Sequence, residues 1–375
     1  MAVQAGAPRV RAAVARAGAV AVACAVLAAC GAGAGSPAPR GPRRGAGVTG
    51  RPPALGRPGG RAARRAGTIT LAFAGDVNFA RRTARLLAHP ATAFGPIAAL
   101  LRSADLTALN LETAVTSRGV PQPKAYHFRT TPAAFTALRD AGVDVVNMAN
   151  NHVLDYGRVG LADTLAAARR ARFPVLGIGA NATAAWRPYL VTVKGLRIAM
   201  LGVSQVAELA SSWVATPARS GEANAINLRR TLDAVRAARR AARVVIVFMH
   251  WGTEGMACAD PGQLSLARRL AAAGASIIVG SHAHMLQGSG WLGRTFVAFG
   301  LGNFLWWEPS FSTSTGVLLL TLRPGRPVTS LSYRFVPATV SPAGQPVIDR
   351  GAAARRALAY YRSLRACAGL TARPG

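Results

Sequence analysis

The chain has 375 residues, of which 51% are hydrophobic, and a formal net charge of +31. This length and composition allow one large folded domain or two ordinary ones, and they exclude a chain that is disordered throughout. The charge comes almost entirely from arginine, since Lys124 and Lys194 are the only lysines. A basic chain favours an anionic partner such as lipid headgroups or an acidic polymer, although a GC-rich genome imposes a similar arginine bias. Nucleic acid is a weaker possibility, because aromatic residues are few and no aromatic-basic strand or Lys/Arg-rich helix stands out.

The first 29 residues have the pattern of an export signal. Three arginines precede an acid-free stretch of small and apolar residues that ends at residue 29. That stretch is too short for a comfortable transmembrane helix. Residues 27–31 read Leu-Ala-Ala-Cys-Gly, which resembles the lipobox of bacterial lipoproteins. We therefore expect residues 1–29 to be a signal peptide and Cys30 to be lipidated; the alternative is an ordinary secretory signal with an incidental cysteine.

Residues 30–66 consist mainly of glycine, alanine, proline and arginine and contain no acidic residue. Such a segment cannot bury enough apolar surface to fold, so we expect a disordered basic tether between the domain and the outer face of the cell membrane. Cys258 and Cys367 lie far beyond it. In an oxidising compartment these two cysteines could form a disulfide, but the sequence alone does not determine whether they pair.

From residue 67 onward, apolar runs rich in β-branched residues alternate with segments of helical periodicity. This pattern predicts that strands alternate with helices. We expect strands over 68–74, 105–109, 143–148, 174–178, 189–193, 197–203, 244–249 and 276–279. We expect helical segments up to about 101 and over 132–141, 159–170, 228–242 and 263–273. This alternation predicts a largely parallel sheet, in which ligands gather at the carboxyl ends of the strands.

The remaining segments complete the predicted domain, which we place over 67–340. Periodicity is lost between 205 and 224, which indicates a loop or lid over the site. Three more strands, over 295–299, 317–322 and 331–336, predict a second and more antiparallel sheet. Residues 341–375 are expected to form a C-terminal helix, over about 351–366, and a tail.

Candidate metal ligands follow five of these strands. The chain has six histidines and fourteen acidic residues in all, so their concentration at strand ends is informative. Carboxylate, amide oxygen and imidazole together suit Mn, Fe or Zn rather than a thiolate-bound structural zinc. The set is large enough for two divalent ions with one carboxylate between them, an arrangement that serves hydrolysis. The candidates are Asp76, Glu112, Asn151, His250, His282 and His284.

The motifs that contain these residues occur in a fixed order over about residues 69–305. They are Gly75-Asp76, Asn110-Leu111-Glu112, Asn150-Asn151-His152 with Asp155-Tyr156-Gly157, His250-Trp251-Gly252 with Glu254, Gly280-Ser281-His282-Ala283-His284 with Gln287, and Gly300-Leu301-Gly302-Asn303-Phe304. In order and spacing they resemble the CapA family, which is named for poly-γ-glutamate capsule synthesis and is related to the calcineurin-like metallophosphoesterases. The resemblance implies a four-layer α/β/β/α sandwich.

The resemblance also implies roles for the candidate ligands. One ion would lie among Asp76, Glu112 and His284. The other would lie among four residues, with Glu112 as the bridge between the two ions. The four residues are Glu112, Asn151, His250 and His282. His152 would then be free to act on the leaving group, with Asp155 to orient it.

Four further residues are expected around the ligands, in support of them or as a wall of the site. They are Asn78, Trp251, Glu254 and Asn303. The chain departs from the pattern of its relatives at several positions. Asn78 stands where the diesterases have histidine, Glu112 replaces the usual bridging aspartate, and Gly255 stands where the CapA family usually has an aromatic residue.

The resemblance implies an exported lipoprotein in the synthesis, anchoring or processing of a cell-surface anionic polymer of the poly-γ-glutamate type, alongside membrane proteins of capsule synthesis. One alternative is an extracytoplasmic metal-dependent phosphoesterase that acts on a phosphate-containing substrate. Another is a catalytically silent scaffold of a surface-polymer assembly. The sequence contains no nucleophile elbow of a serine hydrolase, no P-loop and no dinucleotide-binding glycine motif, which disfavours those classes.

Overall fold

The computed structural model describes residues 67–375. The predicted signal peptide, the tether and Cys30 lie outside the described residues. In the described part no helix combines the length and apolar character needed to cross a membrane.

The first sheet has β1 at its centre, in contact with β2 and β16 as its long neighbours. β1, β2, β5 and β6 run parallel, whereas β16, β17 and β18 form an antiparallel half. The short strand β15 (Asn303–Leu305) also pairs with the end of β1. In spatial order the strands are β18 (Pro346–Ile348), β17 (Ser332–Val340), β16 (Ser314–Leu322), β1 (Ile69–Val77), β2 (Leu106–Leu111), β5 (Val145–Asn147) and β6 (Val175–Leu176).

The second sheet is parallel at its centre and antiparallel at both edges. β9, β11, β12 and β14 run parallel, while β8 and β13 close the edges as hairpin partners of β9 and β14. β11 is apolar on both faces and completely buried, as expected for a central parallel strand. In spatial order the strands are β13 (Ser289–Leu292), β14 (Thr295–Ala298), β12 (Ile277–His282), β11 (Val244–Trp251), β9 (Leu196–Ser204) and β8 (Tyr189–Val193).

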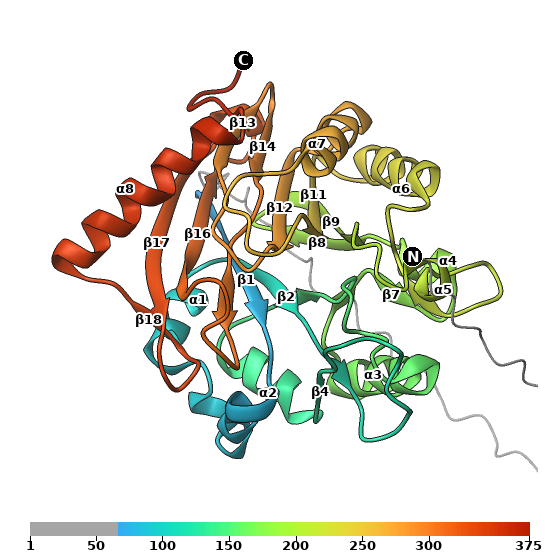
Figure 1. Cartoon of the computed structure of the whole chain (residues 1–375). Coiled ribbons are helices and arrows are strands. Elements are labelled where there is room, and N and C mark those ends of the chain that lie inside the picture. The colour runs from blue at the N-terminus through green and yellow to red at the C-terminus, as the bar shows by residue number, and fades with distance from the viewer. Residues whose placement is uncertain (1–66) are drawn as a thin grey trace, which may run out of the picture. The chain divides into compact units, whose positions relative to one another are not determined.

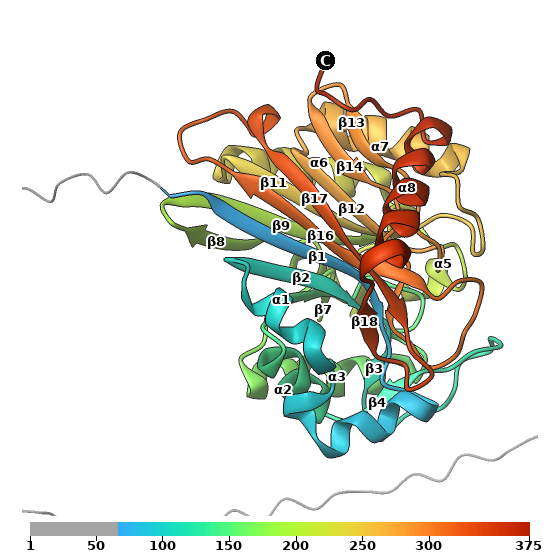
Figure 2. The same ribbon diagram turned by 90° about the vertical axis from the view of Figure 1, so that its left-hand side faces the viewer.

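The two sheets pack face to face, with helices on both outer faces (Figure 2). Along β1, Leu71 and Phe73 point into the core between the sheets, whereas Ala72 and Ala74 point toward the outer helices. This is the two-residue alternation of a strand that is buried on both faces. The helices on the side of the first sheet are α1 (Ala98–Arg102), α2 (Ala133–Asp140) and α3 (Gly157–Ala171), and those on the side of the second are α6 (Leu228–Ala241) and α7 (Pro261–Ala273). The predicted four-layer α/β/β/α sandwich is confirmed.

The predicted membership of the second sheet was partly wrong. β16 and β17 are antiparallel, as expected, but they extend the first sheet beside β1. Only β14 of the three predicted strands belongs to the second sheet, where it lies parallel to β12. β16 has apolar residues on both faces, with Leu318 between the sheets and Leu319 on the helix side, so its apolar run alone does not specify its partner.

Two predicted elements are interrupted at glycine or proline. The helical pattern before residue 101 breaks into short 3-10 helices, with Pro90 and Pro96 at the start of two of them, because proline lacks the N–H that continues a helix. The predicted strand over 174–178 ends at Gly177, whose φ is +78°. After this glycine β7 (Ile178–Gly179) leaves the sheet and pairs with β10 (Gly221–Glu222). The segment over 205–224, which lacks periodicity in the sequence, contains β10 and the short helix α5 (Ala210–Trp213).

The last helix, α8 (Gly351–Cys367), runs beside β17 at the edge of the sandwich (Figure 1). Its Tyr361 ring stacks on Phe335 of β17 with centroids 3.8 Å apart. Cys367 at its end forms a disulfide with Cys258, which lies in the loop after β11, with the Cα atoms 5.6 Å apart. This bond joins the end of the chain to the loop that follows His250.

Loss of this disulfide should destabilise the domain. The cysteines are 109 residues apart in sequence, and closing a loop of that size restricts the unfolded chain by an amount equivalent to about 2 to 4 kcal/mol. We expect a variant with Cys258→Ser and Cys367→Ser to unfold at a lower urea concentration than the oxidised protein. Addition of a reductant should lower the urea midpoint of unfolding of the wild type and leave that of the variant unchanged. Equal midpoints for the oxidised wild type and the variant would contradict the assignment.

Candidate metal centre

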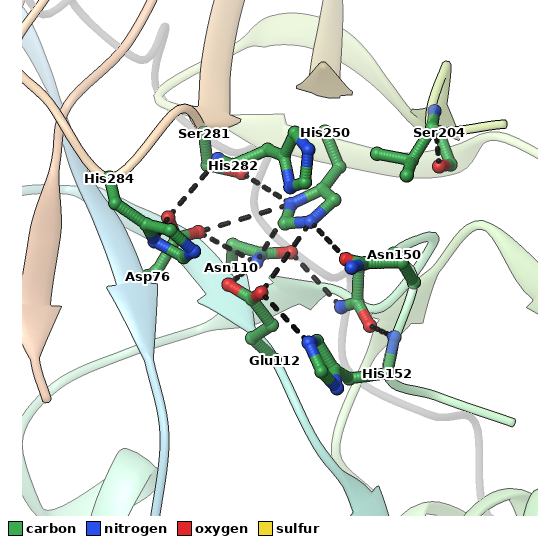
Figure 3. Close-up of polar contacts among 12 residues, drawn as sticks. Asp76, Asn110, Glu112, Asn150, His152, Ser204, His250, Ser281, His282 and His284 are labelled. Carbon is green, nitrogen blue, oxygen red and sulfur yellow. Dashed lines mark hydrogen bonds and ion pairs between the residues drawn. The ribbon is translucent and has the colours of Figure 1, made fainter. Parts of the chain in front are cut away.

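The candidate ligands meet where the carboxyl ends of strands from both sheets converge (Figure 3). The ligands of the first sheet lie within β1 or directly after β2 and β5. Those of the second sheet lie in β11, at the end of β12 or just beyond it. The convergence follows from the parallel direction of these strands within each sheet. The residues are Asp76 in β1, Glu112 after β2, Asn151 and His152 after β5, His250 in β11, His282 at the end of β12 and His284 just beyond it.

These residues form two groups that share Glu112. Within each group the ligand atoms lie within 4.8 Å of one another, and every residue is buried. Asn151 Oδ1 lies 2.8 Å from His250 Nε2, which places this amide beside the second group. The two groups are Asp76, Glu112 and His284, and Glu112, His250 and His282. The structure thus brings together all six predicted ligands, while their binding of metal stays a prediction.

Two atoms in this centre are buried without a hydrogen-bond partner. They are Glu112 Oε1 and His282 Nδ1. A buried polar atom without a partner costs free energy, and such atoms are few in native structures. A divalent cation among the ligands would satisfy a carboxylate oxygen and a neutral imidazole nitrogen at the same time. The residues present therefore fit a divalent metal ion.

The electrostatics of the centre agree with this fit. Burial, reinforced by the neighbouring charge of Asp76, raises the pKa of Glu112 well above its usual value. For Asp76 burial acts in the same direction, but His284, the backbone N–H of His282 and Asn110 outweigh it and lower the pKa. Burial lowers the pKa of His282 to about 3, and that of His250 also falls well below its usual value. Neutral imidazoles keep a lone pair for a metal ion.

The loop after β12 holds its histidines in an unusual backbone conformation. His282 has a φ of +93° and His284 a φ of +55°, in the left-handed region that side chains with a Cβ rarely adopt. The N–H of His282 donates to Asp76 Oδ2 at 3.1 Å, so the turn is tied to a ligand from the other sheet. Strain of this kind persists where surrounding contacts impose it, and it is common at functional sites.

Asn110 is a site residue that the sequence analysis missed. Its Nδ2 donates to Asp76 Oδ1 at 2.8 Å and lies 3.4 Å from Glu112 Oε2 and 3.2 Å from His250 Nδ1. One amide thus contacts ligands from three strands. Asn110 stands two residues before Glu112, so strand alternation places both on one face, and this signal could have identified it.

The four residues predicted around the ligands lie in different environments. Asn303 Oδ1 lies 2.8 Å from His284 Nδ1, so it fixes this imidazole. Asn78 Nδ2 donates to the main-chain oxygen of Glu112 at 3.2 Å, which supports the backbone of the shared carboxylate. Glu254 Oε1 is 4.0 Å from His284 Nε2, at the rim of the centre. Trp251 packs instead in the core between the second sheet and its helices, where its Nε1 donates to the oxygen of Phe299 at 2.8 Å.

His152 lies beside the shared carboxylate with its two nitrogens facing different partners. Its Nδ1 is 2.7 Å from Asp155 Oδ2, and its Nε2 is 3.7 Å from Glu112 Oε1. The ring of Phe128 stacks on the imidazole with centroids 4.1 Å apart. Because a carboxylate only accepts, the proton lies on Nδ1 and the Nε2 lone pair faces the centre. Burial lowers the pKa of His152 to about 4, so this imidazole is neutral near pH 7.

Lys124 is a second residue that the sequence analysis did not assign to the site. Its side chain is 2% exposed, and its ammonium lies 3.1 Å from Asp155 Oδ1 and 2.9 Å from Glu208 Oε2. It also donates to the main-chain oxygen of Asn151. Lys124 thus neutralises the carboxylate that orients His152 and ties it to Glu208 in the segment over 205–224. Its position in a proline-rich loop gave no periodic signal, although lysine is rare in this chain.

Removal of the Lys124 charge should destabilise the domain strongly. Lys124→Met would leave the completely buried carboxylate of Asp155 without its cation, and breaking a buried ion pair from one side costs about 3 to 5 kcal/mol. The other lysine provides the matched control, since Lys194 pairs with Asp105 at 2.7 Å but is 47% exposed. Lys194→Met should cost less than about 1 kcal/mol. Urea unfolding of the two variants measures the difference, and equal costs would contradict the structural role of Lys124.

Comparison with known proteins identifies the family. The family model of the bacterial capsule synthesis protein PGA_cap matches residues 70–306, more than half of the chain. The capsule biosynthesis protein CapA of Bacillus anthracis is 28% identical over 246 residues, which cover 63% of this chain and 59% of that protein. The PGA biosynthesis protein CapA of Bacillus subtilis is 29% identical over 242 residues, which cover 63% of each chain.

The chain thus spans about three fifths of the length of these two curated relatives. Among solved structures, the NAD nucleotidase of Haemophilus influenzae is 14% identical with a TM-score of 0.44, and the match covers 82% of this chain and 65% of that one. The family match contains Asp76, Glu112, Asn151, His250, His282 and His284. The chain therefore belongs to the bacterial capsule synthesis protein family PGA_cap.

Proposed function

We propose that this chain acts in the synthesis, anchoring or processing of a cell-surface anionic polymer of the poly-γ-glutamate type, through a hydrolytic centre that binds two divalent metal ions. The observation that carries the proposal is the pair of ligand groups that share Glu112. Family membership and the capsule-related names of the Bacillus relatives support the polymer as the biological context. The basic charge of the chain suits a polyanionic substrate.

The residues that would hold the ions follow from the two groups. Asp76, Glu112 and His284 would surround one ion, and the second would lie among Glu112, Asn151, His250 and His282. When bound, two such ions polarise the bond that is attacked and supply a nucleophile at neutral pH. Asn303 and Ser281 help to orient two imidazole ligands, since Asn303 Oδ1 lies 2.8 Å from His284 Nδ1 and Ser281 Oγ lies 3.0 Å from His250 Nδ1.

His152 is the proposed proton carrier. Its neutral Nε2 faces the centre at Glu112, so it can accept a proton during attack and return it to the leaving group. Asp155 holds the ring by accepting from Nδ1–H and stabilises the imidazolium that forms. The stacked ring of Phe128 restricts the imidazole to this orientation and excludes water from one face.

The proposed location is the outer face of the cell membrane, with lipidated Cys30 as the anchor and residues 30–66 as a basic tether. The disulfide between Cys258 and Cys367 supports an exported protein, because disulfides persist in oxidising compartments. Membrane proteins of capsule synthesis are the proposed partners there.

A second candidate function is a metal-dependent phosphoesterase. It is favoured by the shared ligand, because Glu112 and the residues around it would hold two ions close together, and such a pair would supply the charge stabilisation that phosphoryl transfer needs. Hydrolysis rates measured on poly-γ-glutamate and on a generic phosphodiester distinguish the two functions. Faster hydrolysis of the polymer would favour the first function, and faster hydrolysis of the phosphodiester would favour the second.

Metal content tests the centre directly. We expect the purified protein to contain one to two equivalents of Mn, Fe or Zn by elemental analysis and to hydrolyse poly-γ-glutamate. His250→Ala combined with His282→Ala should lose most of the metal and the activity, because it removes both imidazoles of one group. His89→Ala is the matched control, since this histidine is exposed and outside both groups. Wild type that stays free of metal and inactive after reconstitution would favour the silent scaffold.

Replacement of His152 should separate chemistry from metal binding. We expect His152→Ala to lower kcat on the turned-over substrate by about 10² to 10⁴ fold, the usual contribution of a proton carrier, while the metal content stays at the wild-type level. Asp155→Asn should lower kcat as well, because an amide can hold the imidazole in the wrong tautomer. An unchanged kcat for His152→Ala with full metal content would remove His152 from the mechanism.

A further inference from the structure

Arg81 carries an exposed charge close to the candidate metal centre. Its guanidinium carbon lies 4.4 Å from the ring centroid of Trp307, which is the geometry of a cation–π contact. The arginine ion pairs in the described part of the chain join Arg118 to Asp163 and Arg236 to Asp233, so none of them neutralises Arg81. The aromatic ring therefore positions this cation without cancelling its charge.

The backbone at Arg81 is strained. Its φ is +48°, in the left-handed region, where a residue with a Cβ pays about 1 to 2 kcal/mol. Glycine would occupy this conformation without that cost. Strain of this kind persists where the surrounding structure imposes it, and it is common at functional sites.

Aromatic side chains connect Arg81 to the catalytic groups. The ring of Trp307 lies 5.8 Å from that of Phe128, and Phe128 stacks on His152 at 4.1 Å. Trp306 lies 4.7 Å from the His284 ring. These contacts form a continuous aromatic wall, made of Phe128, Trp306 and Trp307, between the metal centre and Arg81.

The loop that supplies the two tryptophans is fixed at several points. Arg82 Nη2 donates to the main-chain oxygen of Trp306 at 3.3 Å, and Trp306 Nε1 donates to Ser310 Oγ at 2.9 Å. Phe311 of the same loop is 59% exposed, and its ring lies 5.9 Å from that of His284 in a stacked orientation. A Cβ at Gly255 would lie 2.9 Å from Phe311 Cδ1, so the glycine at this position makes room for the ring.

Among the described residues, the side chains at the centre do not themselves offer a free cation to a substrate. The centre itself contains the carboxylates of Asp76 and Glu112, with Glu254 at its rim. The nearby ammonium of Lys124 is already paired with Asp155 and Glu208. Asp76 and Glu112 would be occupied by the proposed ions and Lys124 by its two ion pairs, so a negative charge on the neighbouring unit of a substrate would need a further cation.

We propose that Arg81, held against Trp307, is a specificity-determining residue that binds a carboxylate of the polymer beside the unit at the metal centre. This inference rests on the proposed function and names the group by which the site selects an acidic polymer. The planar guanidinium suits a carboxylate, which it can bind through two parallel N–H donors.

Binding of a short γ-linked oligoglutamate to the full chain, measured by calorimetry without added metal, tests the proposal apart from catalysis. Arg81→Gln should weaken binding about tenfold or more, because it removes one charge-assisted contact. Arg85→Gln, which removes an exposed charge from the same 3-10 helix, should change the affinity by less than about twofold. Arg81→Lys should retain part of the affinity, since it keeps the charge without the planar fork.

Two further arms separate binding from folding and from general charge attraction. Arg81→Gly should lose binding while its melting temperature equals or exceeds that of the wild type, because glycine relieves the strain at this position. The oligomer with every free carboxylate converted to carboxamide should bind wild type and Arg81→Gln equally.

Several results would overturn the proposal. One is equal affinity of the oligoglutamate for the wild type and for Arg81→Gln. Another is an equal loss of affinity in Arg81→Gln and Arg85→Gln, and a third is the absence of binding to the wild type. Arg81-dependent binding of inorganic polyphosphate in place of the oligoglutamate would overturn the carboxylate assignment. Arg81-dependent oligoglutamate binding in a protein that lacks metal and turnover would remove the hydrolytic centre and leave this inference standing.

Discussion

The site depends above all on the buried carboxylate of Glu112, which both ligand groups share. Burial and the neighbouring charge of Asp76 raise its pKa, and its Oε1 has no hydrogen-bond partner. A carboxylate in this position is costly unless a cation compensates it. The imidazoles of His250 and His282 are held neutral by burial and provide no positive charge. The centre is therefore arranged as an anionic site that a divalent metal ion would stabilise.

This arrangement requires close approach of the main chains that carry the ligands. A Cβ at Gly75 would lie 1.8 Å from the oxygen of Gly302, and one at Gly280 would lie 1.9 Å from the oxygen of Phe299. Only glycine permits these contacts. Gly75 immediately precedes Asp76, and the closeness lets the N–H of Asp76 donate to the oxygen of Gly302 at 3.0 Å. The glycines of both motifs thus serve to bring the ligands of the two sheets together.

The sequence predicted the ligands because each stands at the end of a strand, and parallel strands bring their ends to one edge. It could not predict Lys124, which reaches Asp155 through the path of a loop rather than through a periodic pattern. The apolar runs of β16 and β17 predicted antiparallel strands but not their sheet, since a strand that is apolar on both faces fits beside several partners. Trp251 follows His250 directly, so strand alternation turns it toward the opposite core, away from the wall expected for it.

A crystal structure of the protein loaded with Mn²⁺, with anomalous scattering data, would show whether Glu112 lies between two bound ions. We expect two anomalous peaks about 3.5 to 4 Å apart, with the Glu112 carboxylate between them. Asp76 and His284 should contact one ion, and Asn151, His250 and His282 the other. Absence of anomalous density among these residues, or an ion bound only elsewhere, would show that Glu112 does not organise a metal centre.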